Sequence, residues 1–523
     1  MKRLTAALAL ACALTFAATA AAVDFGANDD TGKYLGAGSS AYFAQMAGAG
    51  LKQNIMTLKW DPAAPMTIPD EAFLDGSMPQ AQAAGIKVVF ALYGTKPTTF
   101  TGDGGTAEAF AAWAGQVART YPAVRTFIVG NEPNQPRFWR PQFDAGGQQA
   151  SAAAFGPVLA AAYDGLKAVD GSIRVVGVGL SPRGNDRADA PSNISTSPVR
   201  FLQALGTWYA GSGRTRPVMD AFSIHPYPNA NTDPLARGYV WPNAGLANLD
   251  RIKQALQDAF RGSSHPTVTS GLKLFIDEFG YQVATDGNAA YSGSENVPVT
   301  SEANQADIYG QASRLVQCDP AVESFSIFGF FDESDRGAGF QAGIVRKDGT
   351  PRPSLNSFRD AIAAGCSGGT VSWSPARGVV GAGARFNDSS PKPAKQKAWN
   401  GNATASEDAV GRVGLFKVRN QTGSRCTPGR IDFVSFGSKS LELIDDTAFK
   451  VKAGFSPLFE LDRRTLTGGC FVYAMTLTAE TNSERVSTFM SNGFIAGPAA
   501  KPAKPAKPAK PGKPGKPGKK GKK

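Results

Sequence analysis

Eight apolar runs of strand type, separated by stretches with helical periodicity, occupy the chain from Val23 to about Cys366. The runs are residues 23–26, 54–60, 86–93, 128–132, 173–178, 221–225, 274–278 and 324–330. Near-continuous apolar strands are typical of a parallel sheet that is covered on both faces. Eight such units predict an α/β fold, a closed (β/α)8 TIM barrel, whose active site lies at the carboxyl ends of its strands. A doubly wound open sheet is the alternative, but no glycine-rich phosphate loop follows the first run.

The pattern changes after the Ser-Gly-Gly sequence at residues 367–369. Short alternating runs follow at residues 413–419, 431–436, 449–452 and 470–477. They predict a small all-β, sandwich-like accessory domain over residues 370–497, with a long loop at 388–408. Residues 498–523 are a repeat rich in lysine and proline, which we expect to be disordered because it has almost nothing apolar to bury.

Residues 1–22 have the features of a secretory signal peptide. Lys2 and Arg3 give a positive start, residues 4–18 an apolar core, and residues 20–22 a small-residue cleavage site. No other stretch reaches the roughly 18 consecutive apolar residues of a membrane-spanning helix. The sequence therefore predicts a barrel domain at residues 23–366 that is secreted or associated with the cell envelope, without a transmembrane segment.

Four cysteines remain once the signal peptide is removed: Cys318, Cys366, Cys426 and Cys470. Export permits disulfides. Four cysteines allow three pairings, and proximity in the sequence favours Cys318–Cys366 and Cys426–Cys470. Each ring of about 45 residues would stabilise the fold by roughly 3–4 kcal/mol in the chain-entropy treatment. No cysteine spacing resembles a zinc site, and the chain has only two histidines, so we expect no metal centre.

The net charge of +12 at pH 7 comes from the two ends of the chain. Residues 501–523 contain ten lysines and no acid, and without these lysines and the two basic residues of the signal peptide, residues 23–500 carry no net charge. The basic composition therefore does not indicate nucleic-acid binding by a folded surface. The tail is either a solubilising spacer or a segment that binds an anionic polymer of the cell envelope.

Two of the apolar runs end in a glutamate, Glu132 and Glu278, each followed by turn-forming residues. A carboxylate at the end of an apolar strand is costly to bury without polar partners, so two such ends favour one shared cleft. Two carboxylates in one cleft can hydrolyse a glycosidic bond, because one protonates the leaving oxygen while the other attacks the anomeric carbon. Taken alone, a glutamate at the end of a strand is more often a helix cap or a salt-bridge partner than a catalytic residue.

Three motifs carry a resemblance to a known group of enzymes. Val-Gly-Asn-Glu-Pro-Asn at residues 129–134, Phe-Ser-Ile-His-Pro-Tyr at 222–227 and Ile-Asp-Glu-Phe-Gly at 276–280 resemble the segments of strands four, six and seven of clan A glycoside hydrolases. The stretch that begins at Trp113, the pair at 138–139 and residues 347–353 are most similar to family 39 or to cellulase-like family 5. The resemblance covers about residues 24–365 and does not extend to the β domain.

The resemblance implies a role for each matching residue. Glu132 would be the acid/base and Glu278 the nucleophile. Asn131 would hydrogen-bond the 2-hydroxyl of the sugar, Tyr227 would hold Glu278, and His225 would complete the polar network.

Further substrate-binding residues follow from the same comparison. Trp60, Tyr93 and Trp139 are candidates for stacking against sugar rings. Lys59 stands where clan members usually carry an arginine that holds the nucleophile, and it lacks the planar fork of a guanidinium. Phe328 stands where they usually present a tryptophan beneath the sugar.

The sequence thus predicts a secreted retaining glycoside hydrolase that acts on β-linked oligo- or polysaccharides by double displacement and needs no cofactor. Two alternatives remain open. One is a catalytically inactive barrel that binds envelope polysaccharide, and the other is a transglycosylase that remodels envelope glycan.

Overall fold

The computed structural model describes residues 23–496, except residues 286 and 492 and the segments 388–397, 420–425, 427–440, 463–465 and 467–468. The chain divides into two compact units between Ala376 and Arg377. The predicted signal peptide, the predicted strand at 431–436, residues 388–397 of the predicted loop and the lysine-rich tail lie outside the described residues. The loop prediction is wrong for the part that follows, because Ala398–Thr404 form a strand that pairs with a neighbour on each side. No helix among the described residues has the length and apolar character needed to cross a lipid bilayer.

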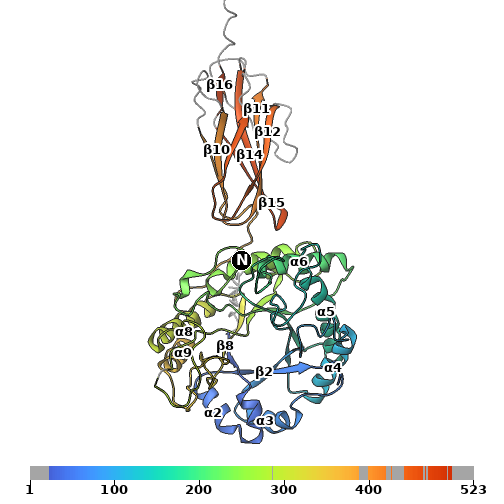
Figure 1. Cartoon of the computed structure of the whole chain (residues 1–523), viewed down its shortest axis with the longest axis vertical. Coiled ribbons are helices and arrows are strands. Elements are labelled where there is room, and N and C mark those ends of the chain that lie inside the picture. Colours follow the sequence, from blue (N-terminus) through green and yellow to red (C-terminus); the bar gives the residue numbers. More distant parts are fainter. Residues whose placement is uncertain are drawn as a thin grey trace, which may run out of the picture. The chain divides into compact units, whose positions relative to one another are not determined.

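The first unit is built on a closed barrel of eight parallel strands, which confirms the predicted fold (Figure 1). The strands are β1 (Asp24–Asn28), β2 (Gln53–Trp60), β3 (Lys87–Gly94), β4 (Thr126–Val129), β5 (Arg174–Leu180), β6 (Ala221–Ile224), β7 (Lys273–Ile276) and β8 (Val322–Phe328). Each strand pairs with the next in the chain, and β8 pairs with β1 to close the barrel. All eight strands therefore end at the same face.

Helices surround the strands as an outer layer (Figure 1). They are α1 (Thr31–Tyr34), α2 (Ser40–Gly48), α3 (Glu71–Ala83), α4 (Ala107–Thr120), α5 (Ser151–Val169), α6 (Pro198–Gly211), α7 (Leu249–Phe260), α8 (Glu302–Gln317) and α9 (Pro353–Ala364). In α4 the Thr106 hydroxyl accepts a hydrogen bond from the Ala109 amide at 3.1 Å and so caps the first turn. Its apolar residues at helical spacing, Phe110, Trp113 and Val117, are buried.

Strand alternation separates two layers of packing in the barrel. One cluster fills the interior: Ile55, Val89, Ala91, Ile128, Val176, Ala221 and Phe275. On β2 the intervening residues Met56, Leu58 and Trp60 belong instead to the larger cluster that includes the helices. Interior-facing positions near the strand ends therefore point into the mouth of the barrel.

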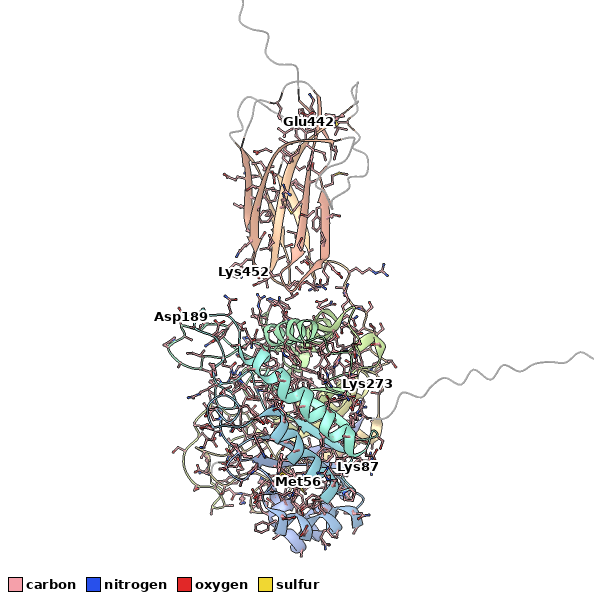
Figure 2. All side chains as sticks on the ribbon, turned by 90° about the vertical axis from the view of Figure 1, so that its right-hand side faces the viewer. Met56, Lys87, Asp189, Lys273, Glu442 and Lys452 are labelled. Atoms are coloured by element: carbon pink, nitrogen blue, oxygen red, sulfur yellow. A yellow bond between two sulfur atoms is a disulfide. The ribbon has the colours of Figure 1, made fainter. Side chains whose placement is uncertain are left out.

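The second unit is an antiparallel β-sandwich, as predicted. Its strands are β9 (Gly383–Asn387), β10 (Ala398–Thr404), β11 (Ala409–Val418), β12 (Leu441–Val451), β13 (Leu458–Asp462), β14 (Gly469–Ala479), β15 (Asn482–Met490) and β16 (Phe494–Ala496). They form one sheet in the order β13-β10-β9 and another in the order β12-β11-β14-β15, with β16 beside β14. One core cluster takes side chains from both sheets, including Phe459 and Leu461 from one and Leu415 and Met475 from the other. Figure 2 labels Glu442 and Lys452 at opposite ends of this unit, which β12 therefore spans.

Two disulfides are present, with the pairing that proximity in the sequence favours. Cys318 follows α8 and is bonded to Cys366, which follows α9, with 4.9 Å between their Cα atoms. The bond ties together two helices of the barrel that already pack against each other. In the sandwich, Cys426 is bonded to Cys470 of β14, with 5.2 Å between the Cα atoms.

Candidate active site

A sharp turn after β4 carries Glu132 into the mouth of the barrel. Gly130 takes φ +101°, and a Cβ there would meet the Phe155 ring at 2.7 Å and the Val178 carbonyl oxygen at 2.8 Å. Glu132 itself has φ +41°, which is uncommon for a residue other than glycine. Its amide donates to the Gly179 carbonyl oxygen at 2.7 Å, and this bond holds the strained turn in place.

Buried polar side chains support the segment that follows Glu132. Asn134 is fully buried, and its amide group donates to the carbonyl oxygens of Ser181 at 3.1 Å and Thr196 at 2.9 Å. Its Oδ1 accepts from the Ser181 amide at 3.0 Å. The second Asn of the 129–134 motif is therefore a structural residue that fastens the Glu132 loop to the loop after β5.

Glu278 lies two residues beyond the end of β7, across the barrel mouth from the β4 turn. Its side chain is 12% exposed. Oε2 accepts a hydrogen bond from the Tyr227 hydroxyl at 2.8 Å, and Oε1 accepts from the Asn28 amide group at 3.4 Å. Asn28 at the end of β1 and Tyr227 after β6 therefore both hold the carboxylate that follows β7.

His225 joins the two glutamates. Its side chain is fully buried, and Nδ1 lies 3.1 Å from Glu132 Oε1 and 3.4 Å from Glu278 Oε2. Because both oxygens contact one nitrogen, they lie no farther apart than the sum of these two distances. Nε2 faces Asp277 Oδ2 at 3.2 Å. Gly179, with φ +67°, allows the close approach, since a Cβ there would stand 3.2 Å from Nε2.

The charges of this cluster shift its pKa values. Burial raises the pKa of Glu278 to about 7, an effect that the charges of Glu132 and Asp277 reinforce and that His225 and Tyr227 oppose. Burial alone would lower the pKa of His225, but the surrounding carboxylates outweigh it and raise the pKa well above its usual value. Burial and the charge of Glu278 raise the pKa of Tyr227 well above its usual value. His225 is thus a buried imidazolium, and Tyr227 a protonated donor.

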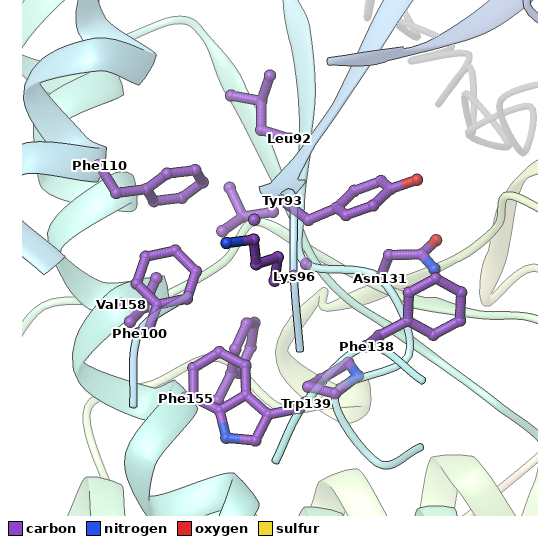
Figure 3. Close-up of a pocket in the computed structure, with 14 residues that line it drawn as sticks. Leu92, Tyr93, Lys96, Phe100, Phe110, Asn131, Phe138, Trp139, Phe155 and Val158 are labelled. Carbon is purple, nitrogen blue, oxygen red and sulfur yellow. The ribbon is translucent and has the colours of Figure 1, made fainter. Parts of the chain in front are cut away.

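A pocket opens beside Asn131 on the β3 and β4 side of the cleft (Figure 3). Tyr93, Lys96 and Phe138 line it with Asn131, and the rings of Tyr93 and Phe138 meet edge to face with centroids 6.2 Å apart. Tyr93 occupies an interior-facing position of β3, and burial with the charge of Glu278 raises the pKa of its hydroxyl. Most of the pocket's other lining residues pack between the barrel and the helices, among them Phe110, Trp139 and Phe155, and neither Glu132 nor Glu278 lines it.

Aromatic residues also stand on the Glu278 side. The ring of Phe328, at the end of β8, lies 6.3 Å from that of Tyr227 and 5.3 Å from that of Phe340. Both phenylalanines are partly exposed. Sequence reasoning found Phe328 but missed Phe340 and Asn28. Asn28 was detectable, since it is a polar residue at the carboxyl end of the first strand, whereas Phe340 lies in a long loop without a pattern.

The stacking roles expected of two tryptophans are wrong. Trp60 is 1% exposed, stacks on Phe100 and donates its indole N–H to the Pro65 carbonyl oxygen at 3.1 Å. Trp139 is 4% exposed and stacks on the same Phe100 ring, edge-on to Phe155. Both rings are packed between hydrocarbon side chains, so neither offers a free face to a sugar.

Lys59 does not take the place of the nucleophile-holding arginine. Its side chain is exposed, and its Nζ lies 5.7 Å from the centre of the Tyr93 ring. The donors to Glu278 are instead Tyr227 and Asn28, both neutral. Among the described residues no group of three or more His, Cys, Asp or Glu side chains has the arrangement of a metal site.

No known protein family profile matches the chain, and no curated protein matches it. Solved structures with a similar fold include a family 39 glycoside hydrolase from the gut symbiont Bacteroides cellulosilyticus WH2, at 14% identity and TM-score 0.46 over 85% of this chain and 81% of that one. A monomeric β-xylosidase from Caulobacter crescentus CB15 is 15% identical, with TM-score 0.42 over 88% and 96% of the two chains. Xylanase 10B from Thermotoga maritima is 13% identical, with TM-score 0.42 over 66% and 95%. At these values the likeness carries no argument about function, which rests on the geometry of the site.

Proposed function

We propose that this protein is a secreted retaining glycoside hydrolase that cleaves β-glycosidic bonds in oligo- or polysaccharides. The observation that carries the proposal is the contact of one histidine nitrogen with both Glu132 and Glu278. The two oxygens can be no farther apart than the sum of their distances to this nitrogen. The carboxyl groups of retaining enzymes stand roughly 5–5.5 Å apart, which lies within that limit, whereas those of inverting enzymes stand roughly 6.5–9.5 Å apart, at or beyond it. Retention is therefore the outcome that the geometry favours.

In the first step Glu132 donates its proton to the leaving oxygen while the ionised Glu278 attacks the anomeric carbon and forms a glycosyl-enzyme. In the second step the Glu132 carboxylate takes a proton from water, which attacks the same carbon and releases Glu278. Tyr227 holds the attacking carboxylate in position by its hydrogen bond. Asn131, next to Glu132 in the chain, would hydrogen-bond the 2-hydroxyl of the sugar, as the motif resemblance implies.

The test is a comparison of Glu278→Ala and Glu132→Ala on an aryl β-glycoside of the sugar that a glycan panel identifies. Both variants should fold, and Glu278→Ala should still bind sugar but lose turnover. Azide should rescue both with opposite stereochemistry. In Glu278→Ala it attacks directly, expels the phenolate and gives the α-glycosyl azide, and in Glu132→Ala it attacks the glycosyl-enzyme and gives the β-glycosyl azide.

The exposed Glu108 of α4 provides a control, since Glu108→Ala should keep full activity. Full turnover by Glu278→Ala would overturn the assignment. Products longer than the substrate would assign the same two residues to transglycosylation, and binding without turnover by the unmodified protein would identify an inactive polysaccharide-binding barrel. Export through residues 1–22 and attachment of the lysine-rich tail to an anionic envelope polymer stay predictions from the sequence.

A further inference from the structure

Four exposed cationic side chains stand on successive loops at the mouth of the barrel. They are Lys59 at the end of β2, Lys96 after β3, Arg137 after β4 and Arg183 after β5, and are referred to below as the cleft cations. Because all the strands are parallel, these four segments lie at the same face as Glu132 and Glu278.

Lys59 points into the barrel mouth. Ile55 lies in the interior cluster, and the period of two along a strand places Thr57 and Lys59 on the same side. The Lys59 ammonium stands 5.7 Å from the centre of the Tyr93 ring, and Tyr93 lies close enough to Glu278 to feel its charge. This cation therefore borders the carboxylate pair.

Lys96 and Arg137 flank the pocket beside Asn131. Lys96 lines that pocket and is drawn within it in Figure 3. The Arg137 guanidinium lies 5.7 Å from the centre of the Phe138 ring, which forms another wall. The two cations therefore stand on the side of the cleft that Asn131 and Phe138 form.

Arg183 is fastened between two segments of the active site. Its carbonyl oxygen accepts a hydrogen bond from the Gln135 side chain, three residues after Glu132. Its guanidinium donates to the carbonyl oxygen of Asn229 at 3.4 Å, two residues after Tyr227. The cation is thus held beside the motif segments of strands four and six.

None of the cleft cations forms an ion pair with any residue in the described part of the chain. Other cations of the same unit do: buried Lys33 contacts Asp30 at 3.4 Å and Asp70 at 3.1 Å, and Arg214 contacts Asp164 at 2.6 Å. The same loops also carry Asp61, Asp103, Asp144 and Asp186, so what distinguishes the cleft cations is their place beside Tyr93, Phe138 and the segment after β6. Unpaired charge of one sign at the rim of a binding cleft favours a ligand of the opposite sign.

We propose that the substrate is an anionic glycan, a β-linked polysaccharide that carries carboxylate or sulfate groups on the sugars lying across the β2 to β5 side of the cleft. The inference rests on the proposed glycosidase function and names its substrate class. The cleft cations bind the anionic groups, and the carboxylate pair cleaves the bond between them.

The test measures binding in the inactive Glu278→Ala background of the full chain, so that turnover does not consume the ligand. One arm compares a β-linked polyuronate with its carboxyl-reduced form, and the other compares a sulfated β-glycan with its desulfated form. The cleft variant is Lys59→Gln/Arg183→Gln. Its matched control is Lys52→Gln/Arg119→Gln, which removes one exposed lysine just before β2 and one exposed arginine in the last turn of α4, the helix that leads into β4, on the opposite face.

We expect at least one anionic polymer to bind about tenfold or more tightly than its neutral form. The cleft variant should lose most of that preference while the control keeps it, and added salt should weaken only the anionic binding. The lysine-rich tail can itself attract polyanions, but it is present in every protein compared, so the difference between the cleft variant and its control does not depend on it. A preference in the polyuronate arm identifies carboxylate groups as the ligand, and a preference in the sulfated-glycan arm identifies sulfate groups.

Equal binding of charged and neutral polymers in both arms would overturn the inference. So would a control variant that loses as much of the preference for the anionic polymer as the cleft variant does. Hydrolysis of a neutral β-glycan with no preference for charge would reject the substrate class while leaving the glycosidase intact. Charge-dependent binding that the cleft variant loses, with no turnover by the unmodified protein, would support the anionic ligand and reject the proposed enzyme.

Discussion

Glu132 and Glu278 end two strands of one barrel and contact the same histidine nitrogen, but their surroundings differ. The Glu132 side chain is 18% exposed and stands on a turn with φ +41°, beside an open pocket. The Glu278 side chain is 12% exposed and receives further hydrogen bonds from Tyr227 and Asn28. A nucleophile must be held still, whereas an acid/base must exchange protons with water. The comparison therefore supports the proposed roles, with Glu278 as nucleophile and Glu132 as acid/base.

Burial and neighbouring charges also act on the pKa of Glu278. Burial raises the pKa of Glu278 to about 7, and no arginine donates to this carboxylate among the described residues. The buried His225 imidazolium is the charge that opposes this rise. The ionisation of Glu278, the proposed nucleophile, therefore depends on the charge of His225 as well as on burial.

The largest effect should come from His225→Asn, which removes the shared positive charge and keeps a neutral amide donor near the position of Nδ1. We expect kcat/KM to fall on the order of 10²-fold or more, since a preorganised charge that faces both carboxylates is lost. Steady-state kinetics and circular dichroism together separate this loss from unfolding.

The other histidine of the chain provides the control for that variant. His265 is buried against the Phe260 ring, with centroids 4.0 Å apart, and has no contact with the carboxylate pair. His265→Phe should leave kcat/KM at neutral pH unchanged. A folded His225→Asn protein with near-normal kcat/KM would remove the basis for treating the two glutamates as one coupled site.

A smaller effect is expected on the pH profile. Glu278 must be ionised to attack, so kcat/KM should fall as the pH drops below an apparent pKa of about 7, and tenfold for each further unit. The Tyr227 hydrogen bond lowers the pKa of Glu278, so Tyr227→Phe should move this limb to higher pH. Tyr281→Phe, a buried tyrosine on the same side of the barrel, should not. If the acid limb of kcat/KM instead had an apparent pKa near the ordinary value of a glutamate, and Tyr227→Phe did not move it, the buried surroundings inferred for Glu278 would be contradicted.

The smallest effect should come from Asn28→Ala. Its hydrogen bond to Glu278 is long, at 3.4 Å, and one neutral hydrogen bond contributes about 0.5–1.5 kcal/mol. We expect kcat/KM to fall only a few-fold, with a small shift of the acid limb to higher pH. A loss as large as that of His225→Asn would show that Asn28, rather than the imidazolium, fixes the nucleophile.

Much of this site was predictable because it follows from topology. Parallel strands in a closed barrel all end at one face, so a polar residue at the end of any strand points toward the same cleft. The rule can be applied to each apolar run separately, and it predicts that Glu132, His225 and Glu278 lie in one cleft. The same rule applied to neutral side chains would have found Asn28 at the end of β1.

The errors came from packing. Lys59 and Trp60 are neighbours on β2, and successive side chains of a strand point to opposite faces. Lys59 therefore points into the barrel mouth and Trp60 toward the helices. Alternation counted from Ile55 would have placed the Trp60 ring in the core. Trp139 had no such signal, because it lies in a loop, and its stacking on Phe100 depends on a contact between segments distant in the sequence.

The sequence by itself determined the two units, the order of the strands and the face at which the polar strand ends gather, because periodicity and strand direction are properties of short stretches. Only the tertiary structure decided which carboxylates contact His225, which cations are left without a counter-ion, and how deeply Glu278 is buried. Those properties are sums over groups from four or more strands, and electrostatic energy depends on their distances in space rather than on their spacing along the chain.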